Sequence, residues 1–127
     1  MLINVLKAKI HSATVTDAQI HYSGSISIDR FLMDKAGLLP HEKVMVVSLD
    51  SGERLETYVI EGNYGKGEIV INGAAARKIL KGEKIIIMSF AQMDLEEYKE
   101  FEPAIVILGD SNSIVRLSGK DFKKDEC

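Results

Sequence analysis

One dipeptide of this sequence, Gly24-Ser25, could take part in covalent chemistry on its own backbone. A serine hydroxyl can attack the carbonyl of the peptide bond before it, which converts that bond to an ester by an N-to-O acyl shift. Glycine on the attacked side offers little steric hindrance and accepts the twist that the attack requires. Taken alone, the pair is more simply explained as a tight turn, because glycine and serine are both common in turns. A chemical role therefore depends on residues elsewhere in the chain.

Self-cleavage at this bond would need a hydrogen-bond donor for the developing oxyanion. Backbone strain in the turn supplies only about 1–3 kcal/mol, whereas removing one oxyanion donor slows a reaction about a hundred- to a thousandfold. Thr57 could be that donor if its strand passes the bend. The simpler explanation of Thr57 is an ordinary β-branched strand residue.

Two side chains of a predicted strand, Arg54 and Tyr58, could handle a small acidic substrate. They lie on one face, where an arginine fork could bind a carboxylate and a tyrosine could donate a proton. The alternative is a solvated strand face on which Arg54 pairs with Glu53 or Glu56.

The segment Asn72-Gly73-Ala74-Ala75-Ala76 could form the start of a helix that is free of bulky side chains. Asn72 could cap this helix, and Gly73 would let a ligand or another backbone approach closely. Free N–H groups at a helix start favour an anion. An ordinary capped helix packed on the barrel is the alternative.

The remaining candidate ligands do not form a pattern typical of a metal site. Lys9 and His11 share a strand face and are by default exposed. The histidines His11, His21 and His41 have no recognisable ligand spacing, and Cys127 is isolated. The sequence therefore predicts no bound metal.

Length and composition indicate a single domain with an ordinary core. The chain has 127 residues, 46% of them hydrophobic and 28% charged. A net charge of -3 argues against nucleic-acid binding by phosphate neutralisation. The single cysteine favours a reducing cytoplasm, and no apolar run is typical of a signal peptide or a membrane span.

The first third of the chain has the alternating pattern of β-strands. A strand is predicted over 6–11, and the phase of the alternation slips at Ser12-Ala13, which indicates a bulge. A turn is predicted at Asp17-Ala18. A second strand is predicted over 20–22, interrupted by the Gly24-Ser25 bend and resumed over 26–28.

The rest of the chain predicts short strands with few helices. Asp29 is a typical helix N-cap and Gly37 a typical stop, and Asp50-Ser51-Gly52 predicts a hairpin turn. Further expected elements are strands over 44–49, 54–60, 69–71, 85–88, 104–108 and 114–117, a loop over 62–67, and short helices over 74–80 and 94–100. Closely spaced short strands favour a small closed or nearly closed β-barrel.

The order and spacing of these motifs resemble those of the bacterial L-aspartate α-decarboxylases, pyruvoyl enzymes that make β-alanine for pantothenate synthesis. The resemblance runs from about residue 1 to residue 117. It rests on Lys9-Ile10-His11, Tyr22-Ser23-Gly24-Ser25, Ile28-Asp29, Gly52-Glu53-Arg54, Glu56-Thr57-Tyr58 and Asn72-Gly73-Ala74-Ala75-Ala76.

The resemblance implies a double-psi β-barrel over 1–117, assembled as a homotetramer with active sites between neighbouring subunits. It also implies self-cleavage into a β chain, 1–24, and an α chain, 25–127. The ester formed by Ser25 would break by β-elimination to dehydroalanine, which hydrolyses to a pyruvoyl group with loss of ammonia. The resemblance assigns no counterpart to the charged tail, 118–127, which is expected to be frayed.

The resemblance also implies roles for individual residues. The pyruvoyl ketone derived from Ser25 would form a Schiff base with L-aspartate and accept electrons as the α-carboxylate leaves. Arg54 would hold a substrate carboxylate, assisted by Lys9 of a neighbouring subunit. Tyr58 would protonate the carbanion, and Thr57 would help to hold the self-cleavage intermediate. The implied pocket also contains Asn72, Gly73, Ala74 and Ala75, with His11, Tyr22, Val47 and Ile86 nearby.

One departure and two rival functions stay open at this point. Position 47 is a valine where many relatives have a tryptophan, which affects the pocket wall but not the chemistry. An unprocessed, non-catalytic barrel would leave the Gly24-Ser25 bond intact. A hydrolase with a free N-terminal Ser25 would be cleaved without loss of ammonia. The sequence does not decide whether cleavage is spontaneous or needs a maturation helper protein.

Overall fold

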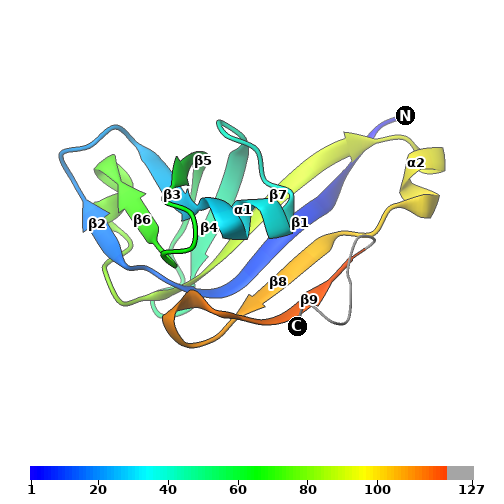
Figure 1. Cartoon of the computed structure of the whole chain (residues 1–127). Coiled ribbons are helices and arrows are strands. Elements are labelled where there is room, and N and C mark those ends of the chain that lie inside the picture. Colours follow the sequence, from blue (N-terminus) through cyan, green and yellow to red (C-terminus); the bar gives the residue numbers. More distant parts are fainter. Residues whose placement is uncertain (120–127) are drawn as a thin grey trace.

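The strand β1 (Ile3–Thr14) is the longest element of the computed structural model, which describes residues 1–119 (Figure 1). It pairs antiparallel with β7 (Lys84–Met93), and the register shifts between Leu6 and Ala8 and again between Ile10 and Ala13. Within the second shift, Ser12 has a positive φ of 65°. The bulge predicted at Ser12-Ala13 is therefore confirmed.

The nine strands form one hydrogen-bonded order, β2-β6-β3-β5-β4-β7-β1-β8-β9. The other strands are β2 (Asp17–Gln19), β3 (Ser25–Asp29), β4 (Lys43–Ser48), β5 (Arg54–Gly62), β6 (Ile69–Asn72), β8 (Ala104–Leu108) and β9 (Ile114–Ser118). The helices are α1 (Arg30–Ala36) and α2 (Leu95–Glu100), with two 3-10 helices, η1 (Gly73–Arg77) and η2 (Asp110–Asn112). The predicted hairpin, the helix over 94–100 and the final strand pair are confirmed.

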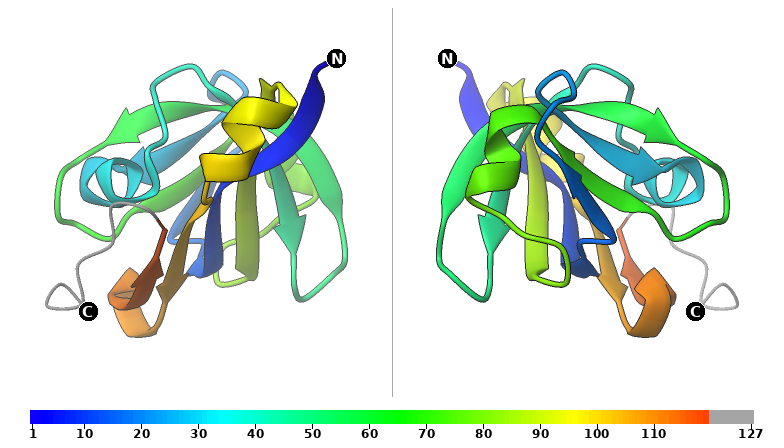
Figure 2. Two further views of the ribbon diagram at one scale, coloured as in Figure 1. Left: turned by 90° about the vertical axis from the view of Figure 1, so that its right-hand side faces the viewer. Right: turned by 90° about the vertical axis from the view of Figure 1, so that its left-hand side faces the viewer.

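The segment that contains β1 and β2 closes the sheet into a barrel. β1 pairs with β7, whereas β2, only two residues further on, pairs with β6 at the opposite end of the order. Between them, the N–H of Val15 donates to the Glu83 carbonyl at 2.9 Å and that of Thr16 donates to the Ile69 carbonyl at 2.8 Å. The strands consequently surround a common interior (Figure 2). The expected mainly β barrel with a few short helices is confirmed, and its double-psi connectivity stays an expectation.

Two predictions for the chain before Ser25 are wrong. Asp17-Ala18 begins the strand β2, because β6 supplies its backbone partners. Hydrogen bonds from the Gln19 side chain and the Ala18 N–H to the Asp17 carboxylate lower the pKa of Asp17. Residues 20–22 form a turn instead of a strand. The side chains of Ile20 and Tyr22 are 42% and 54% exposed, so this segment has no apolar face to bury in the barrel.

The core lies inside the barrel and is made of aliphatic side chains that alternate along each strand. In β3, Ile26 and Ile28 are fully buried, while the serines and the aspartate of the strand lie on its other face. Other completely buried core residues are Ile10, Val46, Val59, Ile69, Ile79 and Ile85. Among residues 1–119 no helix is long and apolar enough to cross a membrane. Of the tail predicted to be frayed, Ser118 ends β9, and 120–127 lie outside the described residues.

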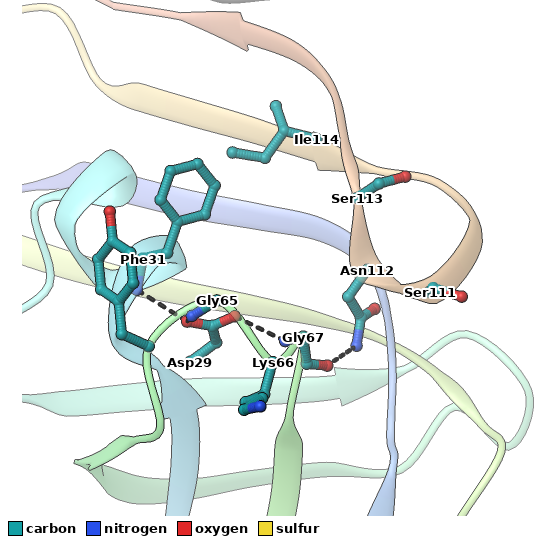
Figure 3. Close-up of a pocket in the computed structure, with 10 residues that line it drawn as sticks. Asp29, Phe31, Gly65, Lys66, Gly67, Ser111, Asn112, Ser113 and Ile114 are labelled. Carbon is teal, nitrogen blue, oxygen red and sulfur yellow. Dashed lines mark hydrogen bonds between the residues drawn. The ribbon is translucent and has the colours of Figure 1, made fainter.

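Asp29 joins three parts of the fold at the end of β3. Its Oδ1 accepts hydrogen bonds of 2.8 Å from the N–H of Phe31 and from the N–H of Gly65, which confirms the predicted N-cap. Its Oδ2 accepts a third bond, of 2.7 Å, from the N–H of Gly67 (Figure 3). The buried carboxylate thus fixes both α1 and the loop before β6 to the end of β3. The predicted helix stop is also confirmed, since Gly37 has a left-handed φ of 72°.

We expect Asp29→Asn to lower the free energy of unfolding by about 2–4 kcal/mol, because an amide presents one acceptor oxygen to the three N–H groups that the buried carboxylate accepts from. Urea denaturation at fixed protein concentration measures this loss. The matched control is Asp34→Asn on α1, where the ion pair with Arg30 is exposed and contributes little to stability. Equal losses in the two variants would contradict a special role of the Asp29 carboxylate.

Candidate active site

Ser25 is held in a defined orientation at the start of β3. Its side chain is only 1% exposed. The hydroxyl donates a hydrogen bond of 3.0 Å to the Ser23 carbonyl and accepts one of 3.0 Å from Nδ2 of Asn72. Within residues 1–119, the hydroxyl therefore has an acceptor and a donor but no carboxylate or imidazole at hydrogen-bond distance. The bend predicted at Gly24-Ser25 therefore holds a buried serine hydroxyl in a defined orientation.

Asn72 lies directly opposite Ser25 in the antiparallel β3–β6 pair. Its side chain is 2% exposed, and Nδ2 donates to the hydroxyls of both Ser25 and Ser27, each at 3.0 Å. The side-chain cap predicted for Asn72 is wrong, because the amide is directed to the two serines. The predicted helix over 74–80 is also too long, since only the short 3-10 helix η1 forms.

Gly73 brings the start of η1 into contact with the Gly24-Ser25 bend. It has a left-handed φ of 77°, and a Cβ added to it would lie 2.7 Å from Cα of Gly24 and 3.0 Å from the Tyr22 carbonyl oxygen. The predicted close approach of another backbone to Gly73 is confirmed. By contrast, a Cβ added to Gly24 would meet nothing within 4 Å, and Gly24 has no left-handed φ. Neither packing nor backbone conformation requires glycine at position 24.

Ala74 and Ala75 follow Gly73 in η1. Ala74 is exposed and Ala75 is half-buried, so neither places bulk over the bend. The predicted pocket segment therefore lies beside Ser25, through the backbone of Gly73 and the side chain of Asn72.

Thr57 and Tyr58 belong to β5, the parallel neighbour of β3. The register pairs Ile26 with Val59, and continuing it by two positions sets Thr57 beside Gly24. Thr57 is half-buried, whereas Tyr58 is 38% exposed and its ring centroid lies 6.3 Å from that of His41. The paired part of β5 ends at Val59, two residues after Thr57, and that of β3 ends at Ile26, two residues after Gly24. The role predicted for Thr57 stays a prediction.

A second group of predicted site residues lies side by side on the outer face of the barrel. Arg54 on β5 pairs with Val47 on β4, and Val47 pairs with Ile86 on β7. Ile86 in turn faces the bulge of β1 that contains His11. Val47 is 9% exposed, so its small side chain is covered by its neighbours between Arg54 and Ile86.

The guanidinium of Arg54 has no carboxylate partner within residues 1–119. Its Nη1 contacts only the sulfur of Met45, at 3.7 Å. The solvated strand face of the alternative interpretation is confirmed, since Arg54, Glu56 and Tyr58 are exposed. Its ion pair is wrong, because Glu53 pairs with Lys78 at 3.6 Å and Glu56 pairs with Lys43. Arg54 is exposed and can bind an external carboxylate.

Lys9 and His11 lie on β1, apart from the Ser25 group. Lys9 is half-buried and pairs with Met88 of β7, while Nδ1 of His11 is buried without a hydrogen-bond partner among residues 1–119. In the described part of the chain, no hydrogen bond or ion pair links either residue to Ser25 or Asn72. One chain therefore holds the predicted site residues in two groups, with Tyr22 exposed in the turn next to the first.

A cavity of about 540 Å³ lies elsewhere, among Phe31, Tyr64, the loop 65–67 and the turn 111–114 (Figure 3). It contains none of the predicted site residues. Over residues 1–119, no three His, Cys, Asp or Glu side chains gather closely enough to hold a metal ion.

Ser27 is not among the predicted site residues, although its hydroxyl shares the Asn72 amide with that of Ser25. The signal was present, because residues two apart in a strand point to the same face. What the sequence lacked was the strand opposite, since only the β3–β6 register places Asn72 on that face.

Known proteins match this chain over nearly its whole length. The model of a family described as aspartate decarboxylase matches residues 1–115. A Caldicellulosiruptor saccharolyticus protein named aspartate 1-decarboxylase is 54% identical over 127 residues, covering 100% of this chain and 98% of that protein. Proteins of the same name from Clostridium botulinum and Clostridium kluyveri are 50% and 49% identical, covering 93% and 98% of this chain and 93% and 96% of their own lengths.

We expect Gly73→Ala to lower the free energy of unfolding by about 2–5 kcal/mol, because its Cβ would strike Gly24 and its φ is left-handed. Gly65→Ala is the matched control, since Gly65 has the same φ of 77° but nothing within 4 Å of an added Cβ. That control should lose only about 1–2 kcal/mol. Chemical denaturation of both variants separates the free-energy cost of the left-handed φ from that of the collision with Gly24. Equal losses in the free energy of unfolding would show that the collision has no effect.

Proposed function

This chain belongs to the aspartate decarboxylase family, and we propose that it converts L-aspartate to β-alanine and carbon dioxide for pantothenate synthesis. The observation that carries the proposal is the arrangement around Ser25. A buried serine hydroxyl is held between the Ser23 carbonyl and the Asn72 amide, directly after a glycine that neither packing nor backbone conformation requires. Such a bond is suited to self-cleavage that turns Ser25 into a pyruvoyl group.

The cleavage begins with attack of the Ser25 Oγ on the Gly24 carbonyl carbon. The hydroxyl proton moves to the amide nitrogen as the peptide bond breaks, which leaves an ester and a free amine on residue 25. Removal of the Cα proton then expels the Gly24 carboxylate and leaves dehydroalanine. Addition of water and loss of ammonia give the pyruvoyl group. Absence of a Cβ on Gly24 keeps the attacked carbonyl open, and Thr57 on β5 is the proposed oxyanion donor.

The residues around position 25 fit a pyruvoyl group. The buried Asn72 amide is a donor already directed at the side chain of residue 25, and Gly73 lets the backbone of η1 lie against the bend. When present, the group supplies a ketone that condenses with the substrate amine and withdraws electrons as the carboxylate leaves. Asn72 and the adjacent backbone would orient it.

Arg54 is the proposed binding residue for a substrate carboxylate. Its guanidinium is exposed and has no acidic partner in the described residues, so no internal ion pair competes with the substrate. A two-point bond between arginine and a carboxylate also selects for its planar geometry. Tyr58, on the same face of β5, would donate the proton that replaces carbon dioxide on the product.

Lys9 would reach the site from a neighbouring copy of the chain. In one chain it is not linked to the Ser25 group, and it lies on the outer face of β1. We therefore propose a homotetramer with each active site between two subunits, in the cytoplasm. The resting hydroxyl of Ser25 has no base at hydrogen-bond distance within residues 1–119, so a maturation helper protein stays part of the hypothesis.

We expect the purified chain to split after Gly24, and the larger fragment to be lighter by one ammonia than a chain that starts with serine. Ser25→Ala should fold but stay uncleaved and inactive, because it lacks the attacking oxygen. Ser89→Ala is the control, since Ser89 is equally buried but its hydroxyl has no hydrogen-bond partner in the described part of the chain, so this variant should be processed normally. Denaturing mass spectrometry measures all three.

The same spectrum distinguishes the rival functions. Fragments without the loss of ammonia would support the N-terminal serine hydrolase. A single intact mass that persists with a maturation helper would support the non-catalytic barrel. Decarboxylation by Ser25→Ala would refute the pyruvoyl mechanism.

We expect Arg54→Lys to raise KM for L-aspartate about tenfold or more while leaving self-cleavage unchanged, because lysine cannot make the two-point bond to a carboxylate. Arg116→Lys is the control, as Arg116 is an exposed arginine on β9. Steady-state release of carbon dioxide gives KM for both variants. An unchanged KM in Arg54→Lys would remove Arg54 from substrate binding.

A further inference from the structure

We propose that Ser27 is a positioning residue for self-cleavage, which acts on Ser25 through the side chain of Asn72. The inference rests on the proposed self-cleavage at Gly24-Ser25. It concerns a residue that none of the motifs above includes as a site residue.

The geometry arises from the alternation of β3. Ile26 and Ile28 point into the core, so Ser25 and Ser27 point to the other face. The antiparallel register sets Asn72 opposite Ser25, and its Nδ2 lies 3.0 Å from the hydroxyl oxygens of both serines.

The hydrogen bonds to Ser25 and Ser27 together orient the Asn72 amide. An asparagine NH2 group has two hydrogens, and each is directed at one serine oxygen. The terminal torsion of an asparagine side chain is broad, so a single bond leaves the plane of the amide free to turn. A second bond from the same nitrogen fixes that plane. Ser27 thereby fixes the direction from which Asn72 donates to the Ser25 hydroxyl.

Loss of the Ser27 hydroxyl would leave one N–H of the Asn72 amide without its acceptor. Asn72 is 2% exposed, so the released N–H could not turn to water without moving the amide. The amide would then reorient toward another acceptor, and the Ser25 oxygen would lose the donor that fixes its orientation next to the Ser23 carbonyl. Because attack requires close alignment of oxygen and carbonyl carbon, a small displacement has a large effect on its rate.

The test measures cleavage of newly made, full-length chain. Wild type, Ser27→Ala and Ser27→Thr are synthesised in a short cell-free pulse, and the intact and cleaved forms are followed over time by denaturing mass spectrometry. We expect Ser27→Ala to be cleaved at least tenfold more slowly than wild type. Ser27→Thr keeps the hydroxyl and should be cleaved within about threefold of the wild-type rate, a rescue that a general loss of stability would not give.

Ser48→Ala is the matched control for loss of a structural serine. Ser48 is 1% exposed, and its hydroxyl donates to Glu83 at 2.6 Å and accepts from the N–H groups of Asp50 and Ser51, in the hairpin turn between β4 and β5. This variant should lose stability in denaturation and yet be cleaved at the wild-type rate.

The outcomes separate this inference from the proposed function. Equal cleavage rates in wild type and Ser27→Ala would overturn the role of Ser27 and leave self-cleavage standing. Equal slowing in the alanine and threonine variants would show that the hydroxyl is not the cause, and would also overturn it. A wild-type chain that is never cleaved, with or without a helper, would overturn the proposed function and this inference with it.

Discussion

The candidate site depends on how β3 is fixed at its two ends. At its start, the Asn72 amide bonds the hydroxyl of Ser25 across the β3–β6 pair. At its end, the carboxylate of Asp29 accepts three backbone N–H groups from α1 and from the loop before β6. Between these anchors, the isoleucines of the strand are locked in the core. A strand fixed by both packing and polar bonds can hold a reactive bond in one geometry, as pre-organised catalysis requires.

Close packing of two glycines explains why the site lies where η1 begins. The backbone of Gly73 approaches Gly24 so closely that a Cβ on Gly73 would collide with it. This contact brings the Asn72 amide and the bend into one unit, and it places the small residues of η1 beside residue 25. The two positions differ in their need for glycine. Packing and a left-handed φ both require glycine at position 73, whereas neither requires it at position 24.

The separation of the site residues into two groups follows from the barrel itself. Side chains that alternate along a strand point inward or outward, and those of Arg54 and Lys9 lie on the outer face. Within residues 1–119, this outer face carries half-buried apolar residues such as Ile86 and a buried imidazole nitrogen of His11 that has no hydrogen-bond partner. Association of copies would supply the missing partners and bring both groups to one site, in agreement with the proposed tetramer.

The sequence alone determined the features that depend on local order: alternating strands, the bulge near Ser12, the α1 caps at Asp29 and Gly37, and the motifs that indicate the family. The predictions from sequence were wrong where the structure depends on pairing between strands that are far apart in the chain. Pairing with β6 turned the predicted turn at Asp17-Ala18 into a strand. The β3–β6 register diverted the Asn72 amide from a helix cap to two serines and so revealed Ser27. Which backbone lies opposite a residue is a property of the whole barrel, because strands far apart in sequence supply each other's hydrogen bonds.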